Sequence, residues 1–121
     1  MNKPYYSDYV EHMMRFYLAH PSIPDEGIND CDRANWDACH ETMSNFSFHS
    51  SAELGSSYMR AVSSVLSQRE PMHLVIPDIA RFYQIPPKEL WDCVKKFEYA
   101  LAKERGLLSG NRCDPAGTER A

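Results

Sequence analysis

The chain has 121 residues, a formal net charge of −4 and 43% hydrophobic residues, which suffices for one domain with its own core. No stretch approaches the roughly 20 apolar residues of a membrane span. The N-terminal MNKPYYSDYV also lacks the basic end and apolar run of a secretory signal. We therefore expect a cytoplasmic protein without a membrane partner.

The first predicted helix covers residues 5–19, and Ser7 or Asp8 is its expected cap. Its apolar positions recur at helical spacing and predict a core-facing stripe. These positions are Tyr6, Tyr9/Val10, Met13 and Phe16/Tyr17.

Residues 20–31 hold two prolines, a glycine and polar residues, which is typical of a loop. A second helix follows over roughly residues 32–46, opened by Asp30 or Asp32, with Trp36, Cys39, Met43 and Phe46 on its inner face. The loop acids Asp25 and Glu26 lie close to this start. We interpret all four acids as solvated or capping groups, because carboxylates need burial to shift their pKa usefully for acid/base catalysis.

The four cysteines Cys31, Cys39, Cys93 and Cys113 are scattered, without the paired spacing of a zinc site or a disulfide framework. We expect reduced thiols in the core or at incidental positions. Cys39 precedes His40, but adjacent residues on a helix point about 100° apart. A buried thiol beside a surface imidazole is therefore the preferred interpretation over a metal pair.

Residues 50–53, SSAE, match a capping box and predict a third helix to about Gln68. The inner face of this helix is expected to carry Leu54, Tyr58, Ala61/Val62 and Val65/Leu66. Residues 71–76 then read as a connection.

A short helix from Pro77, a break at residues 84–86 and a long helix from Pro87 to Gly106 are predicted next. The small Ala80 suits a tight crossing of the two helices. The long helix carries one apolar stripe of Leu90, Cys93/Val94, Phe97 and Leu101.

Together these elements predict an all-α fold of four to five helices with a C-terminal helix-turn-helix, about residues 77–106, whose second helix is long. Residues 1–108 form one helical domain. Residues 109–121 are small and polar and are expected to be a disordered tail.

No nucleotide-binding, metalloprotease, hydrolase or redox motif occurs, so we expect no enzyme, no cofactor and no metal. In a helix-turn-helix the second helix enters the major groove of DNA, here from Pro87. Its expected outward positions are Lys88, Glu89, Asp92, Lys95 and Lys96.

A lysine can bond guanine or phosphate, and a carboxylate can accept from cytosine. We expect Lys95, Lys96 and Lys103 to position the helix on phosphates, and Trp91 to pack on the first helices. The alternative for the whole set is a solvated helix face. The distribution of charge mildly favours DNA binding by the C-terminal part of the chain. Residues 1–50 carry three Lys/Arg and eight Asp/Glu, whereas residues 77–121 carry eight Lys/Arg and seven Asp/Glu.

Three stretches carry a resemblance to a known family: residues 3–17 (KPYYSDYVEHMMRFY), 35–47 (NWDACHETMSNFS) and 76–108 (IPDIARFYQIPPKELWDCVKKFEYALAKERGLL). They resemble the small sigma-70 region-4-like regulators of phages and prophages of Gram-positive bacteria, including the ArpU type. The resemblance implies transcriptional control, with a helix-turn-helix on promoter double-stranded DNA and RNA polymerase as a further partner.

The main hypothesis is thus a DNA-binding regulator. The alternative is a protein-interaction module of the same fold, which binds RNA polymerase or another regulator without touching DNA. The oligomeric state, monomer or homodimer, stays open.

Overall fold

The computed structural model describes residues 6–22, 27–48 and 52–109. These residues form five α-helices and no strand, which confirms the all-α class. The helices are α1 (Ser7–Ala19), α2 (Asp30–Asn45), α3 (Ala52–Ser67), α4 (Met72–Tyr83) and α5 (Pro87–Arg105), followed by the short 3-10 turn η1 (Leu107–Ser109). No helix in these ranges is long and apolar enough to cross a membrane.

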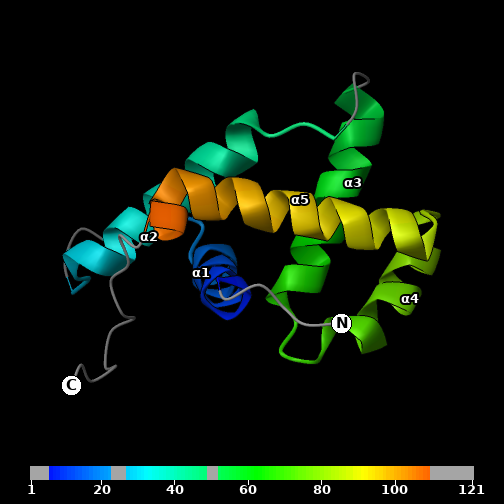
Figure 1. Cartoon of the computed structure of the whole chain (residues 1–121), viewed down its shortest axis with the longest axis horizontal. Coiled ribbons are helices and arrows are strands. Elements are labelled where there is room, and N and C mark those ends of the chain that lie inside the picture. The colour runs from blue at the N-terminus through cyan, green and yellow to red at the C-terminus, as the bar shows by residue number, and fades with distance from the viewer. Residues whose placement is uncertain (1–5, 23–26, 49–51, 110–121) are drawn as a thin grey trace.

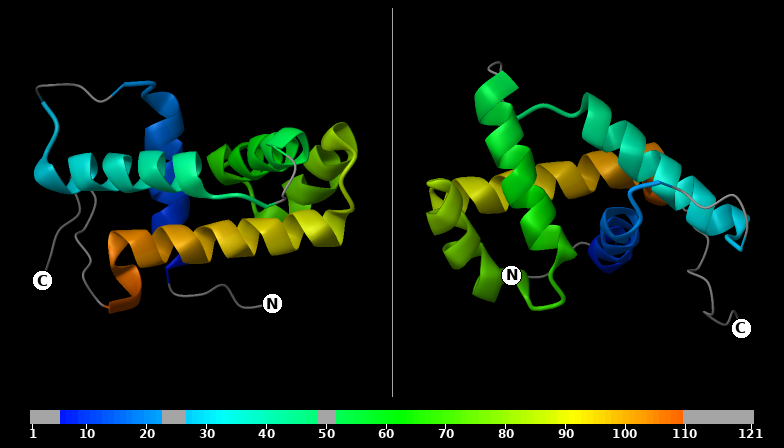
Figure 2. Two further views of the ribbon diagram at one scale, coloured as in Figure 1. Left: turned by 90° about the horizontal axis from the view of Figure 1, so that it is seen from above. Right: turned by 180° about the vertical axis from the view of Figure 1, so that it is seen from behind.

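Helix α5 is the element on which the others are assembled. It runs along the molecule, and α1 to α4 all contact it (Figure 1). Seen from above, α1 crosses both α2 and α5, while α3 and α4 lie toward the N-terminal end of α5 (Figure 2). The predicted stripe of α5 is the centre of the core, because Leu90, Val94, Phe97 and Leu101 are all 0% exposed.

The first two helices begin differently from the prediction. Helix α1 has no side-chain cap, and Ser7 is buried instead of capping the helix. Helix α2 is capped by Asn29, whose side chain accepts the Asp32 N–H at 2.7 Å. The predicted caps Asp30 and Asp32 therefore lie inside the first turn, where their charge favours the helix dipole.

Helix α4 corrects the prediction most clearly. It begins at Met72, not at Pro77, and Pro77 lies inside it. An interior proline costs a helix about 3 kcal/mol. Met72 and Ile76 are both buried, however, and burying such a side chain contributes about 1.5–3 kcal/mol. Two buried side chains in the early turns thus outweigh the proline.

Helix α3 matches its predicted range closely, although Leu54 is 53% exposed and does not face the core. The predicted cap residues Ser50 and Ser51 lie outside the described residues, as does the predicted tail from residue 110 on, whereas Ser109 ends the turn η1.

The cysteines follow the prediction only in part. Cys39 and Cys93 are free and buried. Cys31, in contrast, is disulfide-bonded, so the expectation of a reduced thiol is wrong for this residue. Cys113 falls outside the described residues.

Candidate functional site

The turn between α4 and α5 places the N-terminal end of α5 at the surface. Helix α4 ends at Gln84, which adopts the left-handed conformation with φ 58° and donates its N–H back to Ala80 and Arg81. The Ile85 N–H also returns to the Ala80 carbonyl at 2.9 Å. Pro86 and Pro87 then start α5. Gln84 thus adopts a left-handed conformation that glycine would favour at the end of a helix.

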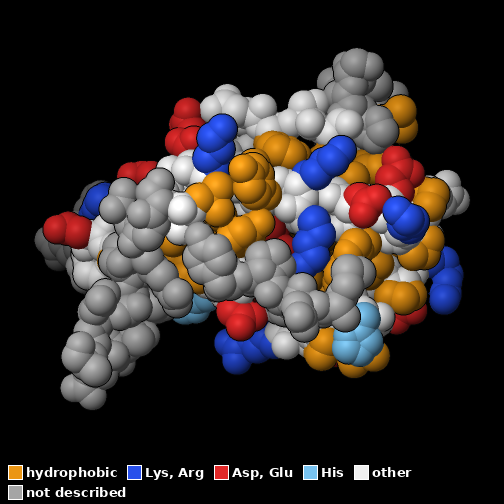
Figure 3. All heavy atoms as spheres, viewed as in Figure 1, with side chains coloured by type: hydrophobic (Ala, Val, Ile, Leu, Met, Phe, Trp, Pro, Cys, Tyr) orange, Lys and Arg blue, Asp and Glu red, His pale blue; other side chains and the backbone are white. Residues whose placement is uncertain are grey.

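The outer face of α5 carries exposed charges along its whole length. The Lys88 and Asp92 side chains are 90% and 54% exposed and form an ion pair with an N–O distance of 3.4 Å. Lys96 and Lys103 are also exposed. Figure 3 shows basic side chains spread along this face, with acidic ones among them near its N-terminal end. The predicted outward positions of Lys88, Asp92 and Lys96 are confirmed.

Two predicted outward residues instead bond to half-buried or buried side chains. Glu89 is half-buried and forms a hydrogen bond with the Tyr58 hydroxyl of α3. Burial is the larger cause of the raised pKa of Tyr58, and this hydrogen bond is the second cause. The Lys95 side chain is only 25% exposed and pairs with Glu98 at 3.5 Å. Neither side chain therefore projects from the outer face of α5.

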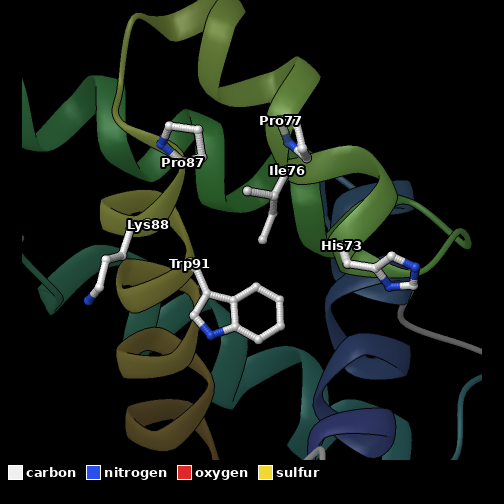
Figure 4. Close-up of a pocket in the computed structure, with 6 residues that line it drawn as sticks. All are labelled: His73, Ile76, Pro77, Pro87, Lys88 and Trp91. Atoms are coloured by element: carbon white, nitrogen blue, oxygen red, sulfur yellow. The ribbon is translucent and has the colours of Figure 1, made fainter. Parts of the chain in front are cut away.

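Trp91 lies beside an open groove between α4 and α5. The groove measures about 460 Å³ and is lined by His73, Ile76, Pro77, Pro87, Lys88 and Trp91. In Figure 4 the Trp91 ring and Ile76 project into the space between the two helices, whereas Lys88 points away from it. The indole is half-buried against the core, and the Lys95 ammonium lies 4.9 Å from its ring centroid. That distance permits a cation–π contact.

A buried polar cluster joins α1 to α5. Glu98 is 0% exposed, and its Oε1 accepts a hydrogen bond from Ser7 Oγ at 3.3 Å. Burial raises the pKa of Glu98 to about 7; Lys95 acts against this rise, and Glu11 adds to it. The sequence reasoning did not single out Glu98. The sequence does indicate that Glu98 is buried, because it follows Val94 by four residues and precedes Leu101 by three, which places it on the apolar side of α5.

A second polar cluster ties the end of α5 to the first two helices. Arg105 Nε donates to Asn35 Oδ1 at 2.6 Å, and Asn35 Nδ2 donates to the Tyr9 hydroxyl at 3.2 Å. Asn35 and Tyr9 are 2% and 4% exposed. Such a satisfied chain of bonds fixes how three helices pack.

The described residues contain no group of three or more His, Cys, Asp or Glu side chains that could hold a metal ion. His40 is exposed, accepts or donates a hydrogen bond with the Tyr17 hydroxyl at 3.1 Å, and stacks on Trp36. The neighbouring Cys39 is 0% exposed, and burial raises its thiol pKa to about 12. A thiol of that kind is unreactive at neutral pH.

Comparison with protein families, curated proteins and solved structures finds no match to this chain. Function is therefore inferred from its own residues.

Proposed function

We propose that this protein is a DNA-binding transcriptional regulator of the sigma region-4-like type, in which α4, the turn and α5 act as a helix-turn-helix. The observation that carries the proposal is the outer face of α5. Lys88, Lys96 and Lys103 are exposed there on a helix whose N-terminal end projects after a three-residue turn. Basic side chains and a helix N-terminus both favour contact with phosphates.

The charges of the helices support this orientation. Helices α1 and α2 together carry six Asp/Glu and two Lys/Arg, whereas α4 and α5 carry five and six. One of those five acids, Glu98, is fully buried and adds little to the surface. The α4–α5 side therefore faces a polyanion with less repulsion than the α1–α2 side does.

In this proposal Lys88 and Asp92 lie nearest the base edges, while Lys96 and Lys103 contact phosphates. The ion pair between Lys88 and Asp92 is largely exposed and contributes little by itself. Either side chain can therefore exchange its partner for a base edge at low cost.

The test is fluorescence anisotropy of a labelled duplex taken from DNA flanking the gene, at about 50 and 200 mM salt, beside a scrambled duplex. We expect binding that prefers the flanking sequence and weakens as salt rises. Lys96→Glu should weaken binding to both duplexes and lower the salt slope by about 1, as loss of a phosphate contact does. Lys88→Glu should also reduce the preference between duplexes.

The matched control is Arg69→Glu, which reverses one exposed charge between α3 and α4. Its binding should stay close to wild type, and circular dichroism should show all three variants folded. Equal loss in all three variants, or none in the α5 variants, would contradict the contact assignment.

The groove beside Trp91 favours the second candidate, a module that binds RNA polymerase or another regulator. Its walls include Ile76, Pro77 and the Trp91 ring, which suit an apolar side chain of a partner protein. If the duplex does not bind at the lower salt, RNA polymerase should be captured by wild type and lost with Trp91→Ala. Capture that survives Trp91→Ala would count against the groove.

A further inference from the structure

The Lys95–Glu98 ion pair lies largely inside the protein, where loss of hydration makes charged groups unfavourable. Glu98 is 0% exposed, and only 25% of the Lys95 side chain meets solvent. Within the described residues, neither Lys95 Nζ nor Glu98 Oε2 has a hydrogen-bond partner, and both atoms are buried. A buried ion pair is favourable only when additional hydrogen bonds satisfy both groups. This pair is therefore poised to change its protonation or its geometry.

The charged groups around Glu98 are few. From α1 comes Glu11, a second carboxyl that hydrogen-bonds Glu98 and raises its pKa, beside the uncharged hydroxyl of Ser7, which donates to Glu98. From α5 itself comes Lys95. In the described part of the chain, no ionisable side chain of α2, α3 or α4 is among the groups that shift Glu98. Among these groups Lys95 is thus the cation that stabilises the ionised form of Glu98.

Lys95 has an open route to solvent. Its side chain also borders a shallow hollow of about 460 Å³, shared with Phe46, Lys96, Tyr99 and Ala100. Lys96 is already exposed beside this hollow. Because a lysine stem has four flexible carbons, rotation of its side chain suffices to bring the ammonium out next to Lys96.

We propose that Glu98 is a positioning residue for Lys95: the ionised carboxylate holds the ammonium inside against Trp91, and the neutral carboxyl releases it to the outer face of α5. The step adds one proton to Glu98 and breaks one ion pair. Without its counter-charge a buried ammonium is strongly disfavoured, so it moves to water. The raised pKa of Glu98, about 7, places this change near neutral pH.

For DNA the released Lys95 is an additional cation on the binding face. This consequence rests on the proposed function, whereas the movement of Lys95 does not. One extra phosphate contact raises affinity roughly fivefold near 0.1 M salt and makes the salt slope steeper by about 1. The protein should therefore bind DNA more tightly at pH 6 than at pH 8.

The fluorescence of Trp91 can report the movement of the Lys95 ammonium in the absence of DNA, because the two groups are in contact. The chain has two tryptophans, so Trp36→Phe leaves Trp91 as the only one. We expect its emission to change in a single transition near pH 7. The transition should disappear in Glu98→Gln, which stays neutral, and in Lys95→Met, which keeps the stem and loses the charge.

His73 lines the same groove as Trp91, so its side chain is an alternative source of a change in the indole emission. His73→Asn is therefore the matched control and should keep the transition. A transition that survives Glu98→Gln, or that His73→Asn removes, would overturn the proposal. Circular dichroism at both pH extremes confirms that each variant is folded.

The DNA arm compares affinities for the labelled duplex at pH 6 and pH 8. The wild-type ratio should exceed the Glu98→Gln ratio roughly fivefold, because every ionisable group other than Glu98 is common to the two proteins. Glu98→Gln should match wild type at pH 6 and bind more tightly than wild type at pH 8, whereas Lys95→Met should match wild type at pH 8 and bind more weakly at pH 6. Equal ratios would overturn the link between Glu98 and DNA affinity. No binding at either pH, with the Trp91 transition intact, would count against the proposed function alone.

Discussion

Two ion pairs on α5 have almost the same N–O distance, but one is exposed to water and the other is largely buried. Lys88 and Asp92 lie 3.4 Å apart with side chains 90% and 54% exposed, whereas Lys95 and Glu98 lie 3.5 Å apart with side chains 25% and 0% exposed. Water screens the first pair, so each charge stays available to another partner. The second pair has lost its water, and burial raises the pKa of Glu98 to about 7. Environment, rather than distance, decides what each pair does.

The same contrast separates the two sides of the helix. The outer side carries exposed lysines, while the inner side joins α5 to α1 through Glu98 and Ser7. In the proposed regulator, a change of charge inside α5 reaches this outer side without a change of fold.

The largest expected effect distinguishes neighbouring residues on these two sides. Phe97 is 0% exposed and packs edge-on against Phe46 with centroids 5.6 Å apart, whereas Lys96 is exposed. Phe97→Ala should lower the free energy of unfolding by about 3–5 kcal/mol, because it removes buried area and leaves a cavity. Lys96→Ala should change it by less than about 0.5 kcal/mol. Urea unfolding followed by circular dichroism measures both; similar losses would refute the division into two sides.

A smaller effect concerns the pH dependence of stability. Because the folded protein raises the pKa of Glu98 from 4.5 to about 7, the folded state binds this proton more tightly than the unfolded state does. The stabilisation is complete below the unfolded pKa and is lost as pH rises through about 7. Its full size is on the order of 3 kcal/mol.

Unfolding free energies of wild type and Glu98→Gln at pH 4.5, 6, 7 and 8.5 measure this contribution. Wild type should lose stability relative to Glu98→Gln as pH rises. Asp92→Asn serves as the control on the exposed pair and should follow wild type at every pH. A parallel course for wild type and Glu98→Gln would show that Glu98 keeps an ordinary pKa.

The smallest effect is the coupling within the exposed pair. A double-mutant cycle with Lys88→Ala and Asp92→Ala should give a coupling energy of about 0.3–0.5 kcal/mol, which falls as salt is added. A value above about 1 kcal/mol that resists salt would mean that this pair is not screened, and the contrast with the inner pair would fail.

The sequence by itself determined the all-α class, the approximate ranges of α1, α2, α3 and α5, and the inner stripe of α5. Leu90, Val94, Phe97 and Leu101 repeat at helical spacing, and any helix with such a stripe must bury it. Exposure of Lys88, Asp92, Lys96 and Lys103 followed from the same periodicity. These features are local, because they depend on the spacing of residues within one segment.

Only the tertiary structure decided which side chains at the edge of that stripe turn inward. Lys95 and Glu89 belong to the polar side by spacing, yet the buried Glu98 and the Trp91 ring attract the first, and Tyr58 of α3 attracts the second. Helix α4 likewise begins before Pro77, at Met72, because the Met72 and Ile76 side chains are buried in the core. A periodic pattern specifies the direction in which a side chain leaves its helix. The free energy of that side chain depends on the neighbours it meets there, and those come from distant parts of the chain.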